Sequence, residues 1–145
     1  MGGHQAGVRV AGRRPHFEAL CREFARAAGR SIFGTPLGEV ASGTVADPAN
    51  KAQIDIDVAV LAPARTGEHR QVISLGEAKW GKVMTPRHVE RLRRAAALLA
   101  VKGYDTNATT LACYSGAGFD PALLAAARDG DVLLVGLDRL YQPRP

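Results

Sequence analysis

The sequence predicts a single α/β domain with a mixed central sheet flanked by helices. Apolar residues recur at helical spacing over residues 17–28, and apolar and polar residues alternate over residues 53–61, which is the period of a strand. Thr85-Pro86 and Asp120-Pro121 are N-cap and first-turn pairs that open two further helices, each followed by a strand-like run. An early meander followed by βαβ units favours a mixed sheet.

The first half of the chain is expected to form one helix and three strands. The helix starts near Pro15 and ends at Gly29. Residues 37–45 could form a marginal strand, and a turn signal follows at residues 47–50. In the strand at residues 53–61, the expected apolar face consists of Ile54, Ile56, Val58 and Val60. Residues 71–79 form a third strand, which we expect to be the hairpin partner of the second.

The second half is expected to alternate between helices and strands. A long helix runs from Pro86 to about Lys102, before Gly103. Residues 109–114 form a short strand, and a helix follows from Pro121 to Arg128. The continuous apolar run at residues 132–137 is typical of a strand that is covered on both faces.

Length and composition fit one domain at residues 15–138, with a flexible leader at residues 1–14 and a C-terminal tail at residues 139–145. A hydrophobic content of 46% argues against disorder, and no apolar run is long enough to span a membrane. Cys21 and Cys113 show no metal-binding spacing, so we expect two buried thiols in a reducing cytoplasm.

The net charge of +5 and the pI near 9.7 suit a polyanionic partner such as nucleic acid. Several of the positive charges lie in the predicted tails, so charge alone does not assign DNA binding.

Four residues could carry chemistry at one end of the sheet. Glu77 and Lys79 are two apart and therefore share a strand face, as do Asp55 and Asp57 on the preceding strand. A hairpin brings these faces together, and grouped carboxylates repel unless a cation such as Mg²⁺ neutralises them. Lys79 would then orient an attacking water and stabilise transition-state charge. The alternative is that all four are ordinary residues of solvated strand faces.

The strings Asp55-Ile-Asp57 and Gly76-Glu77-Ala78-Lys79-Trp80 resemble the signature of the PD-(D/E)xK restriction-endonuclease-like superfamily. The order of elements over residues 15–137 is similar to that superfamily's αβββαβ core. The resemblance implies that Asp57 and Glu77 bind Mg²⁺ or Mn²⁺, that Lys79 is the catalytic lysine, and that Glu18 supports them. No proline precedes the aspartate, and Asp55 competes with Asp57; the apolar run that follows Asp57 favours Asp57.

Within the superfamily, Phe17-Glu18 and Glu77-x-Lys79-Trp80 resemble the nuclease-like domain that follows the P-loop module of certain prokaryotic ATPases. The implied function is Mg²⁺-dependent hydrolysis of DNA phosphodiester bonds. The alternative is a weak or inactive module that binds nucleic acid or protein and works with a P-loop ATPase. A homodimer is compatible with the resemblance.

The long helix carries Arg87, Arg91 and Arg94 at spacings of four and three, which places them on one face. We predict that this face binds DNA phosphates, with a solvated helix face as the alternative. His88 could assist phosphate binding, although an incidental histidine is the more common case. Gly76 to Lys82 fit the letters of a P-loop, but Val83 replaces the Mg²⁺-binding Ser/Thr, so a strand is expected.

Overall fold

A computed structural model describes residues 15–142. The helices are α1 (Pro15–Phe33), η1 (Pro48–Asn50, a 3-10 helix), α2 (Pro86–Val101), α3 (Pro121–Arg128) and α4 (Leu137–Leu140). The strands are β1 (Glu39–Asp47), β2 (Ala52–Leu61), β3 (Val72–Lys79), β4 (Thr110–Ser115) and β5 (Leu133–Val135). They form one sheet in the order β1-β2-β3-β4-β5. β1, β2 and β3 are antiparallel and β3, β4 and β5 are parallel, which confirms the predicted mixed sheet.

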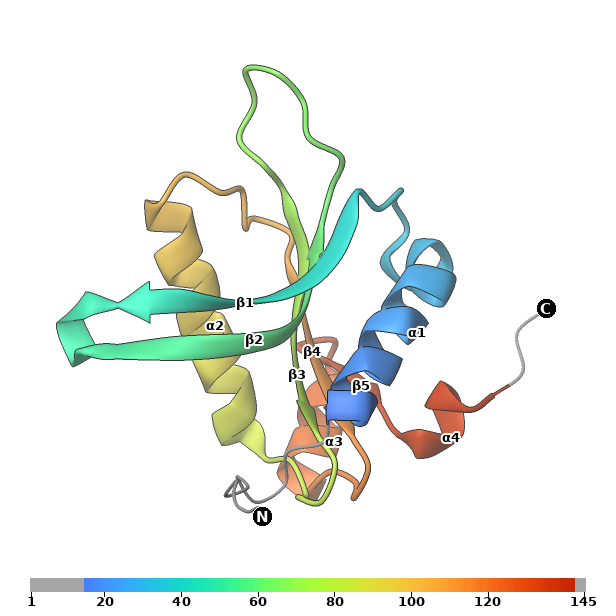
Figure 1. Ribbon diagram of the computed structural model, residues 1–145. Coiled ribbons are helices and arrows are strands. Elements are labelled where there is room, and N and C mark those ends of the chain that lie inside the picture. Colours follow the sequence, from blue (N-terminus) through green and yellow to red (C-terminus); the bar gives the residue numbers. More distant parts are fainter. Residues whose placement is uncertain (1–14, 143–145) are drawn as a thin grey trace, which may run out of the picture.

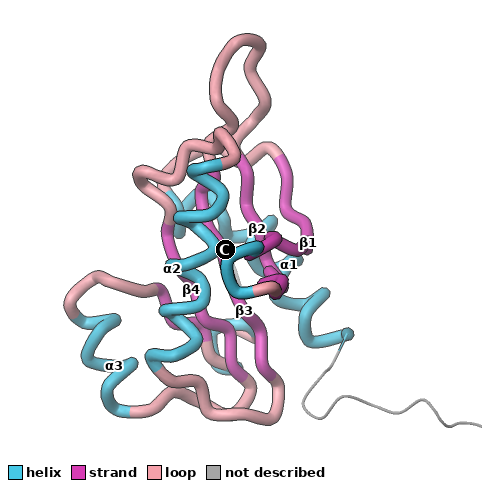
Figure 2. Tube along the Cα trace, turned by 90° about the vertical axis from the view of Figure 1, so that its left-hand side faces the viewer, coloured by secondary structure: helices cyan, strands magenta, loops and turns pink. Residues whose placement is uncertain are grey.

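The sheet separates two hydrophobic layers. α1 and α4 cover one face and α2 and α3 cover the other, as Figures 1 and 2 show. Because β3 and β4 are covered on both faces, nearly all of their residues are buried. β3 is the central strand, and its C-terminal end is therefore the place where residues from both layers can meet. Within residues 15–142, no helix combines the length and apolarity that crossing a membrane requires.

The first helix is longer than its sequence predicts. We expected Gly29 to end α1, but the helix continues to Phe33 and ends before Gly34, which has a φ of 75°. A Cβ added to Gly29 would overlap with the side chain of Leu37. Gly29 is thus a point of close packing inside the helix, and Gly34 supplies the left-handed conformation that ends it.

The apolar run at residues 132–137 was also misassigned. Only residues 133–135 form a strand, and Leu137 already begins α4. The run changes structure because Gly136 serves as the N-cap of this short helix. Leu140, which falls in the predicted C-terminal tail, is 3% exposed and packs in the α1 layer. The predicted leader at residues 1–14 lies outside the described residues.

β2 does not present one apolar face along its whole length, contrary to the sequence prediction. Ile54 and Ile56 pack in the α2 layer, whereas Val58 and Val60 pack in the α1 layer. The register explains the switch, because only Ser42 of β1 lies opposite the two β2 residues at positions 57 and 58. This β-bulge inserts one extra residue into β2. The apolar side chains after the bulge therefore point to the opposite face of the sheet from those before it.

The P-loop-like letters around Gly76 are confirmed to be a strand, since β3 includes Gly76. A Cβ at Gly76 would lie 2.7 Å from Tyr114 Cε1 on the adjacent strand β4. The glycine therefore makes room for a buried tyrosine ring, and it has no phosphate to approach.

Candidate active site

The candidate site lies where β2 separates from β3. The ladder between these strands ends at the Val58–Gly76 pair, while β2 remains paired with β1 as far as Ala52. Figure 1 shows the β1–β2 hairpin turning away from the lower part of β3. Asp57 is the first residue of β2 beyond the ladder, directly at the bulge, so its side chain can approach the open edge of β3.

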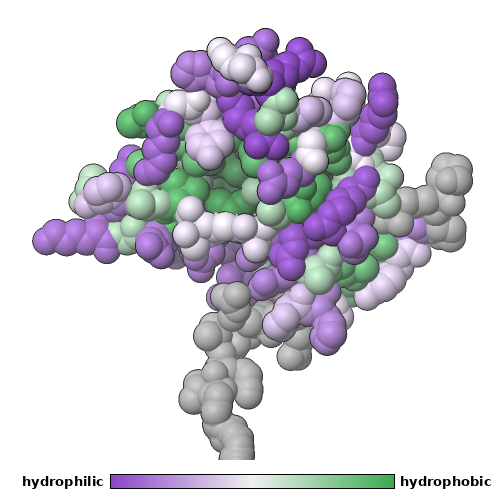
Figure 3. All heavy atoms as spheres, turned by 45° about the horizontal axis from the view of Figure 1, so that its top comes forward, coloured by the Kyte–Doolittle hydropathy of each residue, from purple (hydrophilic) through white to green (hydrophobic). Residues whose placement is uncertain are grey.

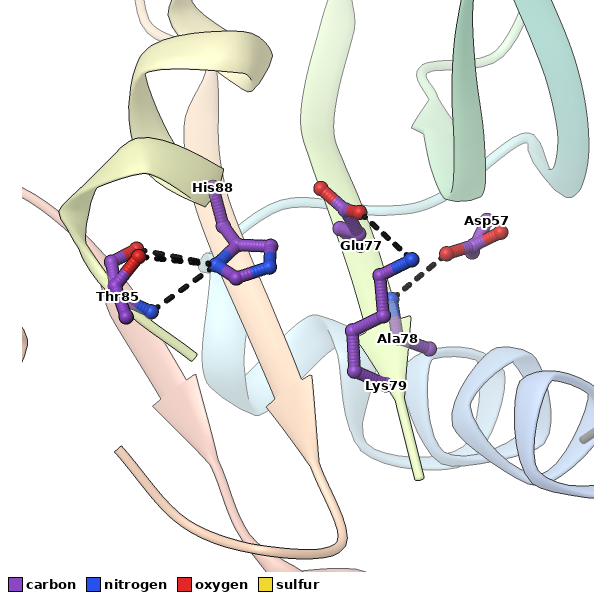
Figure 4. Close-up of polar contacts among 6 residues, drawn as sticks. All are labelled: Asp57, Glu77, Ala78, Lys79, Thr85 and His88. Carbon is purple, nitrogen blue, oxygen red and sulfur yellow. Dashed lines mark hydrogen bonds and ion pairs between the residues drawn. The ribbon is translucent and has the colours of Figure 1, made fainter. Parts of the chain in front are cut away.

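Asp57 links three elements of the fold. Its Oδ2 accepts a hydrogen bond from the Ala78 N–H of β3 at 2.8 Å, which Figure 4 shows. Its backbone carbonyl accepts a hydrogen bond from Arg22 Nη1 of α1 at 3.0 Å. The carboxylate thus occupies a place where a ladder hydrogen bond would otherwise lie, and α1 fixes the backbone that carries it.

The surroundings of Asp57 disfavour its negative charge. Burial raises the pKa of its carboxyl from the ordinary 3.8 to about 6, and the Ala78 hydrogen bond only partly opposes that rise. The negative charges of Glu18 and Glu77 raise the pKa of Asp57 further. The positive charge of Lys79 lowers it, and this is the smallest of these effects. A carboxyl group with a strongly raised pKa, held between other carboxylates, is typical of a functional site.

Glu77 and Lys79 lie next to Asp57 at the end of β3. Glu77 is 4% exposed, and its Oε2 lies 3.3 Å from Lys79 Nζ. β3 is paired with β4 through both residues, opposite Cys113 and Ser115. The backbone under this pair is therefore rigid, and Figure 4 shows its two side chains and Asp57 gathered around the end of the strand.

The two predicted supporting acids differ in position. Glu18, in the first turn of α1, is near enough for its charge to raise the pKa of Asp57. Asp55 is exposed and lies opposite Thr44 of β1, on the part of β2 that has left β3. The structure therefore groups Glu18 with Asp57, Glu77 and Lys79 but does not bring Asp55 to them.

The three arginines of α2 that were predicted to bind phosphate also differ in position. Arg87 and Arg91 line a cavity of about 390 Å³ that also includes Glu77, Lys79, Lys82, Val83, Thr85 and His88. Arg94 does not line that cavity, since its Nη2 lies 2.8 Å from Asp47 Oδ1 and its Nε lies 3.3 Å from Asp47 Oδ2. Through its ion pair with Asp47, Arg94 instead attaches the C-terminal end of β1 to α2.

The donor set fits a magnesium-type ion better than a structural zinc ion. Among residues 15–142, no group of three or more His, Cys, Asp or Glu side chains is placed to hold a metal. Zinc sites use three or four such ligands, whereas Mg²⁺ is commonly held by one or two carboxylates with water and phosphate oxygens. Asp57 and Glu77 provide that smaller set, and a cation there would relieve the charge that raises the pKa of Asp57.

Two residues that position or line this region were not selected from the sequence. Lys82 lines the cavity, and Ser115 Oγ donates to the Lys82 carbonyl at 3.2 Å while accepting from the N–H groups of Ala117 and Gly118. Lys82 stands in the loop directly after the Glu-x-Lys strand, so its basic charge was a usable signal. Ser115 gave none, because its role depends on contacts between two loops.

Comparisons with known proteins support the fold. No family model and no curated protein matches the chain. The MspJI restriction endonuclease, solved in complex with a 27-mer oligonucleotide, aligns with a TM-score of 0.50 and 19% identity over 89% of this chain and 27% of its own. A protein of unknown function, AF1548, aligns with a TM-score of 0.45 and 16% identity over 86% of this chain and 60% of its own.

This chain therefore spans about a quarter of the length of the MspJI chain that it matches. At this level of identity the likeness concerns the backbone, and it agrees with the element order and the mixed five-stranded sheet described above. The protein has a restriction-endonuclease-like α/β fold.

Proposed function

We propose that this protein is a metal-dependent DNA nuclease that hydrolyses phosphodiester bonds. The observation that carries the proposal is the convergence of Asp57, Glu77 and Lys79 at the split between β2 and β3. The buried carboxylate of Glu77, the half-buried carboxylate of Asp57 and Lys79 would supply cation binding and charge stabilisation in one place. The MspJI endonuclease, which shares the fold, was solved with an oligonucleotide.

Asp57 and Glu77 are the residues that would hold Mg²⁺ or Mn²⁺. When bound, such an ion lowers the pKa of its water and neutralises charge on a phosphodiester. Asp57 must be ionised to act as a ligand, and its raised pKa makes that ionisation costly below about pH 6. Metal binding by this protein is therefore expected to weaken as the pH falls through 6.

Lys79 is assigned to the attacking water and to the charge that develops on the phosphate. Its side chain is 33% exposed, so Nζ can reach substrate from its position beside Glu77 Oε2. An ammonium at that position orients the water lone pair and stabilises negative charge in the transition state. Glu18 is assigned a supporting role through its charge at Asp57.

A second function is a nuclease-fold module that binds nucleic acid or protein with little cleavage. The basic cavity lined by Lys79, Lys82, Arg87 and Arg91 supports it, because a cationic surface binds the phosphates of nucleic acid without any need for cleavage. From the sequence we also predict that the protein works with a P-loop ATPase module, forms a homodimer and is located in the cytoplasm.

Nicking of supercoiled plasmid tests the enzyme. The parent protein is incubated with Mg²⁺ or Mn²⁺ beside Asp57→Asn, Lys79→Ala and the control Asp55→Asn, which removes an exposed acid from the same strand. We expect nicking by the parent and the control, and a loss of at least about 100-fold in the other two variants. DNA retention without nicking by any of these proteins would replace the enzyme with the binding module.

A further inference from the structure

The cavity beside the candidate site is strongly basic. Of the eight residues that line it, Lys79, Lys82, Arg87 and Arg91 are positively charged, and Glu77 is the single acid. Lys82, Arg87 and Arg91 are exposed. A cavity of about 390 Å³ with this charge has room for a phosphate group next to Glu77 and Lys79.

His88 is oriented by the start of α2. It is the third residue of the helix, and its Nδ1 lies 3.0 Å from the backbone nitrogen of the N-cap residue Thr85. Nδ1 also lies 3.3 Å from the Thr85 carbonyl oxygen, but its shorter contact is with the Thr85 N–H, which can only donate, so this geometry assigns Nδ1 as the acceptor in the neutral ring. The proton is therefore on Nε2.

The protonated nitrogen faces the candidate site. In Figure 4, Nδ1 points to Thr85, and the opposite side of the ring faces the region of Glu77 and Lys79. His88 lines the same cavity as those two residues and is half-buried. The helix cap thus fixes both the ring orientation and the tautomer of a donor that is directed into a basic cavity.

The loop that carries Lys82 is also held in place. Ser115 Oγ binds the Lys82 carbonyl, and the Met84 N–H donates to the Gly118 carbonyl at 3.0 Å. Since Met84 is fully buried, the connection between β3 and α2 is anchored at two points. The donors of the cavity therefore come from backbone that the fold has already ordered, which lowers the entropic cost of binding.

We propose that His88, Lys82, Arg87 and Arg91 form a binding site for a DNA backbone phosphate next to the one that is cleaved. His88 donates its Nε2–H to a phosphate oxygen, and the three cations neutralise the phosphate charge. Arg94 does not belong to this site, because Asp47 binds its guanidinium. The inference rests on the proposed nuclease function, since it takes DNA as the ligand and the Glu77–Lys79 pair as the neighbouring reaction centre.

The test is fluorescence anisotropy of a labelled DNA duplex in EDTA, over a range of NaCl concentrations. His88→Glu retains a side-chain acceptor for the Thr85 N–H, as in an ordinary capping box, but has no N–H donor in place of the imidazole Nε2–H. We expect it to keep the parent's Tm and to weaken binding about tenfold. Arg91→Ala should also weaken binding and reduce the slope of log K against log salt by about one.

Arg93→Ala is the matched control. Arg93 is exposed on the same helix, pairs with Glu90 at 3.3 Å and does not line the cavity. Arg93→Ala changes the net charge by the same amount as Arg91→Ala, but it removes no residue of the cavity. DNA binding should therefore stay close to the parent's. Equal weakening by Arg91→Ala and Arg93→Ala, or parent-like binding by His88→Glu, would overturn the phosphate site.

Nicking by the parent separates this inference from the proposed function. If the parent nicks plasmid while His88→Glu binds DNA normally, the nuclease stands and the phosphate site is wrong. If the parent never nicks, but His88→Glu and Arg91→Ala bind DNA more weakly than Arg93→Ala does, the phosphate site stands and the nuclease is wrong.

Discussion

The β1–β2 hairpin carries two carboxylates in opposite environments. Asp47, at the end next to η1, is 3% exposed and accepts hydrogen bonds from Arg94 and Asn50. Those bonds, led by the one from Arg94, lower its pKa to about 2. Asp57, in the middle of β2 at the bulge, has a pKa raised to about 6 by burial and by the charges of Glu18 and Glu77.

The difference distinguishes an acid with a structural role from the acid to which we assign a function. The charge of Asp47 is neutralised within the fold, and its bonds attach the hairpin to α2. The charge of Asp57 is opposed by burial and by neighbouring acids, so only a proton or a cation compensates it fully. On the proposed function, the fold gives up stability at Asp57 so that a cation can bind there.

The largest expected effect comes from removing the second acid beside Asp57. Glu77→Gln takes away a proposed cation ligand, so we expect plasmid nicking to fall about 100- to 1,000-fold. The pKa of Asp57 should fall at the same time, because the negative charge of Glu77 raises it. Carboxyl ¹³C titration by NMR measures the second effect, and Glu90→Gln, an exposed acid on α2, is the control. An unchanged nicking rate would remove Glu77 from the mechanism.

The second-largest expected effect is a change in the stability of the protein with pH, which the titration of Asp57 causes. The folded protein binds a proton at Asp57 up to about pH 6, whereas the unfolded chain releases it near the ordinary 3.8. Stability therefore falls as the pH rises from about 4 to 6 and stays lower above that range. The two-unit difference corresponds to at most about 3 kcal/mol.

The Asp57→Asn variant has no carboxyl group at this position, so it should not lose stability between pH 4 and 6 in this way. Relative to the parent, its free energy of unfolding should be higher at pH 7–8, and the gain should disappear towards pH 4. Urea denaturation at each pH measures it, with Asp55→Asn as an exposed control. A gain that does not depend on pH would show that desolvated charge is not the cause.

A smaller effect is expected at the Asp47 end. Arg94→Ala leaves Asp47 buried with only Asn50 as a side-chain partner, so we expect the Tm to fall by several degrees. Because the pKa of Asp47 is lowered, the stability that it provides is present at neutral pH and is lost only as the pH falls towards 2. Thermal unfolding at pH 7 and pH 3 tests this, and Arg93→Ala should behave like the parent at both values. A Tm loss as large in Arg93→Ala would refute the role of the Asp47 ion pair.

The sequence allowed prediction of those features that depend on local spacing. Glu77 and Lys79 share a strand face because they are two residues apart, and the end of β3 places them together. The caps at Thr85 and Asp120 likewise marked the true starts of α2 and α3. These features need only the period of one element or the chemistry of one turn.

Other features depend on contacts between distant residues. Asp55 and Asp57 look equivalent in an alternating pattern, but the bulge opposite Ser42 leaves only Asp57 at β3. Arg91 and Arg94 share a helix face, yet Asp47, which is 47 residues from Arg94, decides which of them is available to a ligand. Strand register and long-range ion pairs leave no local pattern. The sequence favoured Asp57 over Asp55 only through the apolar run that follows Asp57, and the difference between Arg91 and Arg94 could not be predicted.

The smallest expected effect also tests the comparison of the two acids directly. A ligand that binds only the folded state raises stability by RT ln(1 + [L]/Kd), which is about 1.4 kcal/mol at ten times Kd. Mg²⁺ should therefore raise the Tm of the parent by a few degrees at pH 8 and less at pH 5, where Asp57 is largely protonated. Asp57→Asn should lose this response, and Asp47→Asn should keep it despite a lower starting Tm, because Arg94 already neutralises Asp47. An equal response to Mg²⁺ in both variants would mean that the ion screens general charge, and the distinction between a structural and a functional carboxylate on this hairpin would fail.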